Sequence, residues 1–285
     1  MPEHHLRPVH GTDPVVISAS PEVVGWTYLD FSVIELDAHQ LFEVDHVGRE
    51  VAVVALSGIV QARAGAENFE LSRASVFEQQ PHVLYVPPGT PLTLEGVAGR
   101  SRCAVGGAPA EGRYPTRLFS PSEMRIELRG GGAARRQVGH ILSHPLPAER
   151  LILYEVLVPR GTWSGWPPHC HDGYDGSPYL EETYYFELQP ADGFVLHRNY
   201  RLDEDFDELF TAHHGDVVAV TKGYHSSVAC PGSNMFFLNF LAGDLLDEER
   251  ARPPCFDGRY TWILDDWESG ALDLTITRAD ASGAA

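Results

Sequence analysis

The hydrophobic positions of this 285-residue chain gather in short runs that end at turn residues. Runs of about four to eight residues rich in Val, Ile, Leu, Tyr and Phe, bounded by Gly, Pro or Asp, are typical of β-strands. Because Ser57-Gly58 separates two such runs, we expect a hairpin there. Helical periodicity is confined to residues 121–126 and 244–251, so the pattern predicts an all-β chain with minor helices. The predicted strands are 51–56, 59–62, 82–86, 91–94, 151–158, 183–188, 193–198, 216–220 and 235–240.

Two segments separated by 134 residues share one pattern. HVLYVPPGTP (82–91) and DVVAVTKGYH (216–225) each hold an apolar strand, a two-residue break, a glycine and a return strand. This offset is close to half the chain, as a duplicated domain requires. Turn-rich sequence between residues 130 and 147 interrupts the strands, so we expect the join there and two domains, 1–140 and 141–285.

Acidic residues dominate the charge balance. Forty Asp and Glu against 21 Lys and Arg give a formal net charge of −19 and an isoelectric point near 5.0. Such a surface repels a phosphate backbone and no basic cluster offsets it, so nucleic acid is not expected as a partner. A negatively charged small molecule is compatible with this balance only where a local cation or metal supplies the opposite charge.

The sequence predicts neither a membrane span nor a secretory signal. The longest apolar stretches, 51–56 and 151–158, are far shorter than the roughly 20 residues needed to cross a bilayer. Residues 1–12 are rich in His and Pro and contain no apolar signal core. The cysteines show no C-x-x-C spacing and are too sparse for a disulfide framework, so a reducing cytoplasm is expected. They are Cys103, Cys170, Cys230 and Cys255.

Candidate chemistry is concentrated in WPPHCHDGYDGSPYLEETYYFEL, residues 166–188. In an extended segment His169 and His171 point to the same side, where two imidazoles suit a divalent metal. Glu182 opens an aromatic strand eleven residues later, and His225 supplies a third imidazole in the second repeat. Three imidazoles and one carboxylate make a mixed nitrogen and oxygen site suited to Mn, Fe, Ni or Zn.

Two alternatives stay open at this point. The chain has 14 histidines, so these could be ordinary surface residues. Glu181 and Glu182 are neighbours, and only one of them can face the site. Glu182 is in phase with Tyr184 and Glu181 with Tyr185, and spacing alone does not decide between the two phases.

The order H-x-H, E and a distal H after a K-G-type turn resembles the cupin superfamily, whose small β-barrels hold a metal inside. PPHCHD, LEETYY, GFVLHRNY, GDVVAVTKGYH and NFLAG are similar, more closely, to the 5-deoxy-glucuronate isomerases of bacterial inositol catabolism. These are related to the 4-deoxy-L-threo-5-hexosulose-uronate isomerases of pectin breakdown. VFEQQPHVLYVPPGT also fits, and the resemblance covers roughly residues 25–265. It implies a bicupin, two jelly-roll-like barrels in one chain, with metal ligands His169, His171, Glu182 and His225.

This resemblance implies a metal site in the second barrel alone. The first half has Pro91 at the position of His225, and residues 42–46 offer a single histidine, His46. Two positions depart from the family pattern, since His197 stands where Gln is usual and Ser226 where Pro commonly follows the last His. We therefore expect the first barrel to lack metal.

The implied reaction interconverts 5-deoxy-D-glucuronate and 5-dehydro-2-deoxy-D-gluconate. A proton leaves carbon 2 and reaches carbon 1 through an enediol or enediolate, whose charge a divalent ion stabilises as a Lewis acid. Zn or Mn is expected in first place, with Fe or Ni as alternatives. We also expect a homo-oligomer with a small-molecule deoxy-uronate as its partner. The candidates for the base are Tyr184 or Tyr185, Glu181, His197 and a metal-bound hydroxide. Those for substrate binding are Arg198, Lys222 and Tyr185.

Other functions fit the same ligands. They are an isomerase of the pectin-derived 4-deoxy-hexosulose-uronate, a cupin oxygenase with Fe(II), and a non-catalytic sugar-binding bicupin. Consumption of oxygen during turnover distinguishes the oxygenase, and isomer formation under nitrogen excludes it. No helix-turn-helix motif or basic patch supports a DNA-bound regulator.

Overall fold

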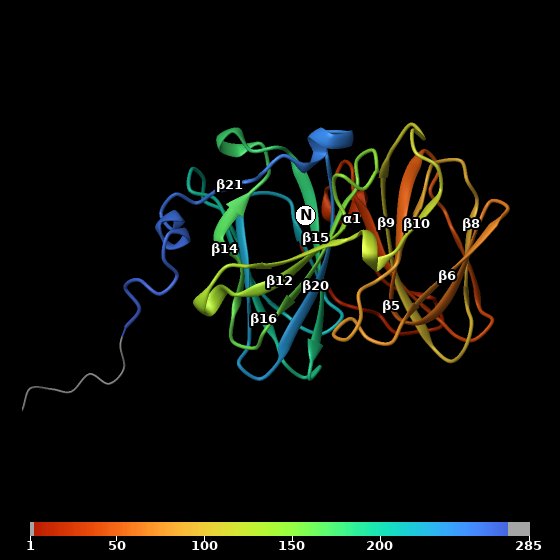
Figure 1. Cartoon of the computed structure of the whole chain (residues 1–285), viewed down its shortest axis with the longest axis horizontal. Coiled ribbons are helices and arrows are strands. Elements are labelled where there is room, and N and C mark those ends of the chain that lie inside the picture. The colour runs from red at the N-terminus through yellow and green to blue at the C-terminus, as the bar shows by residue number, and fades with distance from the viewer. Residues whose placement is uncertain (1–2, 273–285) are drawn as a thin grey trace, which may run out of the picture.

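Two β-barrels of the cupin type lie side by side in the computed structural model, which describes residues 3–272 (Figure 1). The strands from β2 to β10, red to yellow, form one barrel, and those from β11 on, yellow-green to blue, form the other together with β1. The all-β prediction is confirmed. The first barrel is a nine-stranded sheet that folds over on itself. Its strands are β2 (Val15–Ala19), β3 (Asp30–Leu36), β4 (Leu41–Val44), β5 (Arg49–Ala64), β6 (Glu67–Arg73), β7 (Val83–Val86), β8 (Leu92–Gly96), β9 (Ser101–Pro109) and β10 (Arg117–Phe119).

The second barrel consists of two facing sheets. The larger has the order β1-β18-β15-β20-β13-β12-β11, and the smaller has the order β17-β16-β19-β14-β21. The larger sheet contains β1 (His5–Leu6), β11 (Arg125–Arg129), β12 (Arg136–Leu142), β13 (Ile152–Val158), β15 (Leu180–Gln189), β18 (Val217–Val220) and β20 (Asn234–Gly243). The smaller contains β14 (Trp163–Cys170), β16 (Val195–Tyr200), β17 (Asp207–Ala212), β19 (Tyr224–Ala229) and β21 (Cys255–Phe256).

Helices are few and short among residues 3–272. The one α-helix, α1, spans Pro21–Val24. The helix expected at 244–251 is a 3-10 turn over Asp247–Ala251, and that expected at 121–126 is a 3-10 turn over Pro121–Glu123. None of these helices is long and apolar enough to cross a membrane. The remaining 3-10 turns are Gly132–Ala134, Tyr174–Gly176 and Thr261–Leu264.

The strand β5 corrects one sequence prediction. Ser57-Gly58 is no hairpin, because β5 continues through it for 16 residues. Gly58 has φ +80° and the register against β9 shifts between Ala55 and Ser57, so the dipeptide is a bulge that bends the strand. Before the bend β5 pairs with β7, and after it with β6 and β8.

Both faces of the central sheets are buried, which explains why their strands read as continuous apolar runs. In β5, Val51 and Val53 pack inside the first barrel, while Ala52 and Val54 pack between the barrels. The same inter-barrel cluster takes Phe240 from β20, whose ring lies 5.3 Å from that of Phe31 on β3. The two barrels therefore share one hydrophobic core in addition to their own interiors.

The boundary between the two barrels does not fall at the middle of the chain. β11 and β12 pair with each other and with β13, and β1 pairs with β18. The boundary expected between residues 140 and 141 falls inside β12. The change of sheet takes place earlier, between β10, which pairs with β7, and β11.

Two buried carboxylates connect the barrels reciprocally. Glu50, on β5 of the first barrel, accepts hydrogen bonds of 2.6–2.8 Å from the backbone N–H groups of residues 149–151, just before β13. Glu181, on β15 of the second barrel, accepts bonds of 2.6–2.9 Å from residues 27–29, just before β3. Each carboxylate thus fixes the segment that leads into a strand of the other barrel.

Candidate active site

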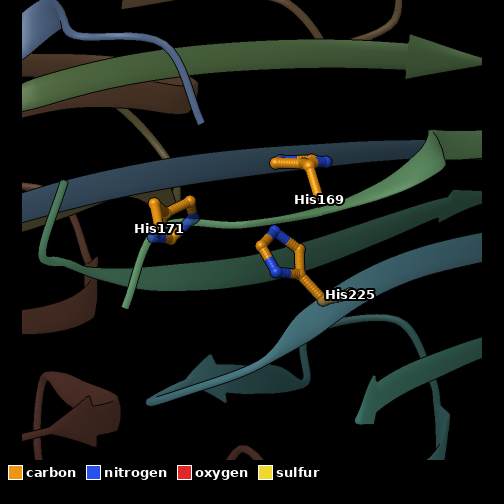
Figure 2. Close-up of side chains that lie close together, drawn as sticks. All are labelled: His169, His171 and His225. Carbon is orange, nitrogen blue, oxygen red and sulfur yellow. The ribbon is translucent and has the colours of Figure 1, made fainter. Parts of the chain in front are cut away.

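Three histidines converge inside the second barrel. His169 is the last residue but one of β14 and lies directly opposite His225 on β19, while His171 follows β14. Figure 2 shows the three rings turned toward one another from these neighbouring segments. One ligand nitrogen from each residue lies within 4.8 Å of the other two, a spacing that suits ligands around one ion.

Backbone contacts orient two of these rings. The Nδ1–H of His171 donates to Leu180 O at 2.9 Å, and that of His225 donates to Gly223 O at 3.3 Å. Both rings are left with Nε2 as the ligand atom, the arrangement typical of metal-binding histidines. Nε2 of His225 is buried and, apart from the close carboxylate of Glu182, has no partner among residues 3–272, so an ion between the two would satisfy both groups.

Glu182 adds a carboxylate to this cluster. Its Oε2 lies 3.0 Å from Nε2 of His171 and 3.1 Å from Nε2 of His225. Although burial opposes ionisation, these two imidazoles hold the pKa of Glu182 well below its usual range, so the carboxylate is charged. The set of three imidazoles and one carboxylate fits a divalent metal.

Local backbone geometry brings the strands together at this point. The register of β14 against β19 shifts between Ser164 and His169. Gly165 lies in that shift with φ +68°, and a Cβ on it would approach His225 O to 3.2 Å and Ser226 Cα to 3.3 Å. A side chain there would push β19, which carries His225, away from β14.

The cluster lies in a cavity of about 460 Å³ between the two sheets. Alternate residues of β11, β12, β13, β15 and β20 form one wall, as the inner face of a sheet requires. Although the chain carries a net charge of −19, Glu182 is the only acidic residue among the described residues that line the cavity. Five arginines line it: Arg125, Arg129, Arg136, Arg250 and Arg252.

Among the predicted catalytic residues, Tyr184 lines this cavity and Glu181 and His197 do not. The Tyr184 ring centre lies 5.7 Å from that of His225, and burial together with Glu182 raises the pKa of its hydroxyl well above the usual range. Glu181 points to the other face of the sheet, toward residues 27–29.

His197 lies behind His225 rather than in the cavity. The two rings stack with centres 6.3 Å apart. Both ring nitrogens of His197 are used, by Ser227 Oγ and Asn199 Oδ1 at 2.8 Å each. Burial and the neighbouring His225 lower the pKa of His197 to about 3, so it is a neutral packing and positioning residue and not a base in contact with substrate.

The three residues predicted to bind substrate also lie elsewhere. Tyr185 faces the first barrel, where its hydroxyl bonds to Arg102 and to Glu187. Arg198 is on the outer face of β16, in a bidentate pair with Asp207 at 2.8 and 2.6 Å. Lys222 pairs with Glu204 at 2.8 Å, beside the ring of Phe206. Arg198 and Lys222 therefore each have a carboxylate partner already, at the surface of the protein.

The cavity residues that sequence reasoning missed come mainly from β11 and β12. The segment RIELRGGGAARRQVGH, residues 125–140, holds four arginines in an otherwise acidic chain. That local excess of basic residues is the signal that could have identified this wall. The glycines of this segment interrupt the strand pattern, so the sequence predicts the join between the halves there instead. Tyr154, Asn239 and Arg250 carry no comparable signal.

Structural comparison defines the class of protein. Oxalate decarboxylase of Bacillus subtilis, a cupin-fold protein, superposes with a TM-score of 0.62 at 11% identity, over 86% of this chain and 78% of that one. That likeness shows the fold alone. An IolB-like protein from Salmonella typhimurium superposes with a TM-score of 0.86 at 32% identity, over 92% of this chain and 99% of that one. The chain is a bicupin with a histidine cluster in its second barrel.

Sequence comparison defines the family. The KduI/IolB family matches residues 4–263. A 5-deoxy-glucuronate isomerase of Geobacillus kaustophilus is 38% identical over 88% of this chain and 91% of its own length. One from Bacillus licheniformis is 37% identical over 84% of this chain and 89% of its own length. The chain belongs to the KduI/IolB family, and it is an isomerase.

Proposed function

We propose that the chain is a metal-dependent aldose–ketose isomerase that converts 5-deoxy-D-glucuronate to 5-dehydro-2-deoxy-D-gluconate in inositol catabolism. The observation that carries this proposal is a cluster of three histidines and Glu182, all buried except the partly exposed His169, in a cavity otherwise lined by basic, neutral and apolar residues. Such a cavity attracts an acidic sugar into a chain whose overall charge repels it. The names of the relatives indicate the substrate.

His169, His171, Glu182 and His225 are the residues that would hold the ion. When bound, the ion supplies Lewis acidity to the oxygens next to the carbon that loses its proton. Imidazole and carboxylate ligands are suited to Zn or Mn, with Fe or Ni as alternatives. In the first barrel, His46 uses both ring nitrogens on backbone carbonyls, those of Arg49 and Thr90, and Pro91 offers no ligand, so we propose that the first barrel holds no metal.

The residues of the chain contribute proton handling and water exclusion. Tyr184 is the one predicted catalytic side chain in the cavity, and its raised pKa keeps the phenol protonated near neutral pH. It is therefore placed to donate a hydrogen bond to a substrate oxygen, while the proton from carbon 2 needs a base other than this neutral phenol. His171, Glu182 and His225 are all buried, which limits exchange of that proton with solvent.

Metal analysis of the purified protein, followed by NMR of its reaction with 5-deoxy-D-glucuronate in heavy water, tests this function. We expect about one divalent ion per chain and a ketose product that carries deuterium, in part or in full, at the carbon that receives the proton. Turnover under nitrogen excludes the oxygenase, and exclusive turnover of the pectin-derived uronate would assign the other substrate. Absence of metal, or absence of any isomer from a metal-loaded protein, would overturn the proposal.

The variant His225→Ala tests whether metal binding and activity depend on the histidine cluster of the second barrel. Without this imidazole we expect most of the metal and at least about 100-fold of the activity to be lost. His39 lies in the first barrel and is exposed, so His39→Ala is the matched control and retains both. Equal metal content in the two variants would show that the ion is bound elsewhere.

A further inference from the structure

We propose that Arg136, on β12, binds the carboxylate of the sugar acid. This inference rests on the proposed function, because it identifies the group that recognises the acidic end of that substrate. It replaces Arg198 and Lys222, which are paired with carboxylates outside the cavity. Three features of Arg136 carry the inference: its lack of a counter-ion, its register partner and its position in the cavity.

Arg136 is a buried cation without an anion. The residue is only 7% exposed. Its side chain makes one hydrogen bond among residues 3–272, which runs from Nη1 to Ala134 O at 3.0 Å. No carboxylate of the described residues lies within ion-pair distance of it. Burial and the nearby Arg129 lower its pKa to about 10, so it remains charged at neutral pH. An unpaired buried charge is costly, and a bound anion removes that cost.

The other buried arginines show the contrast. Arg73 forms a buried pair with Glu155, at 2.9 Å between Nη2 and Oε2. Arg250 donates to the backbone carbonyls of Leu151, Asp247 and Leu146. Both guanidinium groups are satisfied by the protein itself. Arg136 alone among these three buried arginines keeps donors free for a ligand.

The register of β11 against β12 places a second cation beside it. Arg129 and Arg136 are directly opposite each other, and both line the cavity. Like charges in that relation destabilise a sheet, so the pair indicates a place for negative charge. Arg129 is half-exposed and its Nε already bonds to Glu127 at 2.7 Å, so Arg136 is the one of the two with donors left for the contact.

The position of Arg136 suits a substrate held at the metal ligands. It lines the same cavity as His169 and Tyr184. Gly130 leaves room for it, because a Cβ there would come within 3.0 Å of Nη1. A planar guanidinium can hold a carboxylate through two parallel hydrogen bonds.

Two substrates test the assignment. One is 5-deoxy-D-glucuronate, and the other is the matching 5-deoxy-aldohexose, in which a hydroxymethyl group replaces the carboxylate. We expect the unaltered enzyme to prefer the uronate, and Arg136→Met to reduce kcat/KM for the uronate about 100-fold, mainly through KM. Activity on the neutral sugar and metal content should stay unchanged. Arg135 is the exposed neighbour, so Arg135→Met is the control and leaves both substrates unaffected.

Stability separates substrate recognition from a structural role. Removal of an unpaired buried charge should keep or raise the Tm of Arg136→Met, whereas loss of a structural contact lowers it. Arg136→Lys keeps the charge without the planar fork, and we expect a loss of about 10-fold, confined to the uronate. If neither variant changes the preference for the uronate in an active enzyme, the assignment of Arg136 is wrong. If the unaltered enzyme isomerises neither sugar, the proposed function fails instead.

Discussion

Glu181 and Glu182 are adjacent on β15 and have unrelated surroundings. Oε2 of Glu182 lies within 3.1 Å of two imidazoles inside the second barrel. The carboxylate of Glu181 lies on the other face of the sheet, where it accepts the backbone N–H groups of residues 27–29. Because successive side chains of a strand alternate, one residue belongs to the candidate metal centre and the other to the contact between barrels.

Paired amide substitutions separate these two roles. Glu182→Gln should lose most of its metal and at least about 100-fold of its activity. Glu181→Gln should keep its metal but lose about 2–4 kcal/mol of unfolding free energy, because an amide nitrogen cannot accept the buried N–H groups. Metal analysis and denaturant unfolding of both variants check this. A Glu181→Gln protein that unfolds like the unaltered chain would contradict the structural role.

Residue spacing predicted the metal cluster better than the substrate contacts. His169, His171, Glu182 and His225 do converge, because β14, β15 and β19 bring them to one point inside the second barrel. The basic wall depends on β11 and β12 pairing beyond β13, which is a matter of sheet order. Sequence spacing shows which side chains share a face of a strand, but not which face is inside.

At the level of the element, β5 shows how one strand can serve two sheets. Its bend at Gly58 directs residues 60–64 toward β6 and β8 after residues 51–54 have paired with β7. A glycine between two apolar runs is equally typical of a turn and of a bulge. Only the strands on either side decide between them, and they come from distant parts of the chain. The hairpin prediction was wrong for that reason.

Glycine replacements measure what this bend requires. In Gly58→Ala the new Cβ would lie 2.8 Å from Ser101 Cα, at φ +80°. We expect a loss of about 3 kcal/mol, from both the close contact and the backbone conformation. Gly48 has φ +70° and open space around it, so Gly48→Ala should cost only about 1 kcal/mol. Urea unfolding of the two variants gives the comparison, and equal losses would show that the contact with Ser101 contributes nothing.

At the level of the whole molecule, the barrels are coupled through a common core. The inter-barrel cluster contains Phe31 and Val54 from the first barrel and Phe236 and Phe240 from the second. The buried pair of Arg73 with Glu155 crosses the same interface. Separation of the barrels would expose this apolar surface and leave two buried charges unpaired.

Unfolding should therefore proceed in one cooperative step. We expect a single calorimetric transition in which the calorimetric and van't Hoff enthalpies agree, measured on the metal-free protein so that loss of the ion does not add a second event. The variant Glu50→Gln should lower the Tm of this single transition without splitting it. Two resolved transitions in the unaltered chain would show that the barrels unfold independently.

The exchange of contacts by Glu50 and Glu181 has a consequence for the origin of the chain. Each glutamate binds the segment that leads into a strand of the other barrel. In a symmetric homodimer, one residue makes the same contact twice in this way, once from each subunit. In a dimer of identical single-barrel subunits, a single glutamate per subunit would be enough to make both contacts. Fusion of two copies would keep the contact in both halves, while Pro91 could then replace a ligand in one of them. The reciprocal contacts of Glu50 and Glu181 are those expected of a two-barrel chain that arose by gene fusion from an ancestral homodimer.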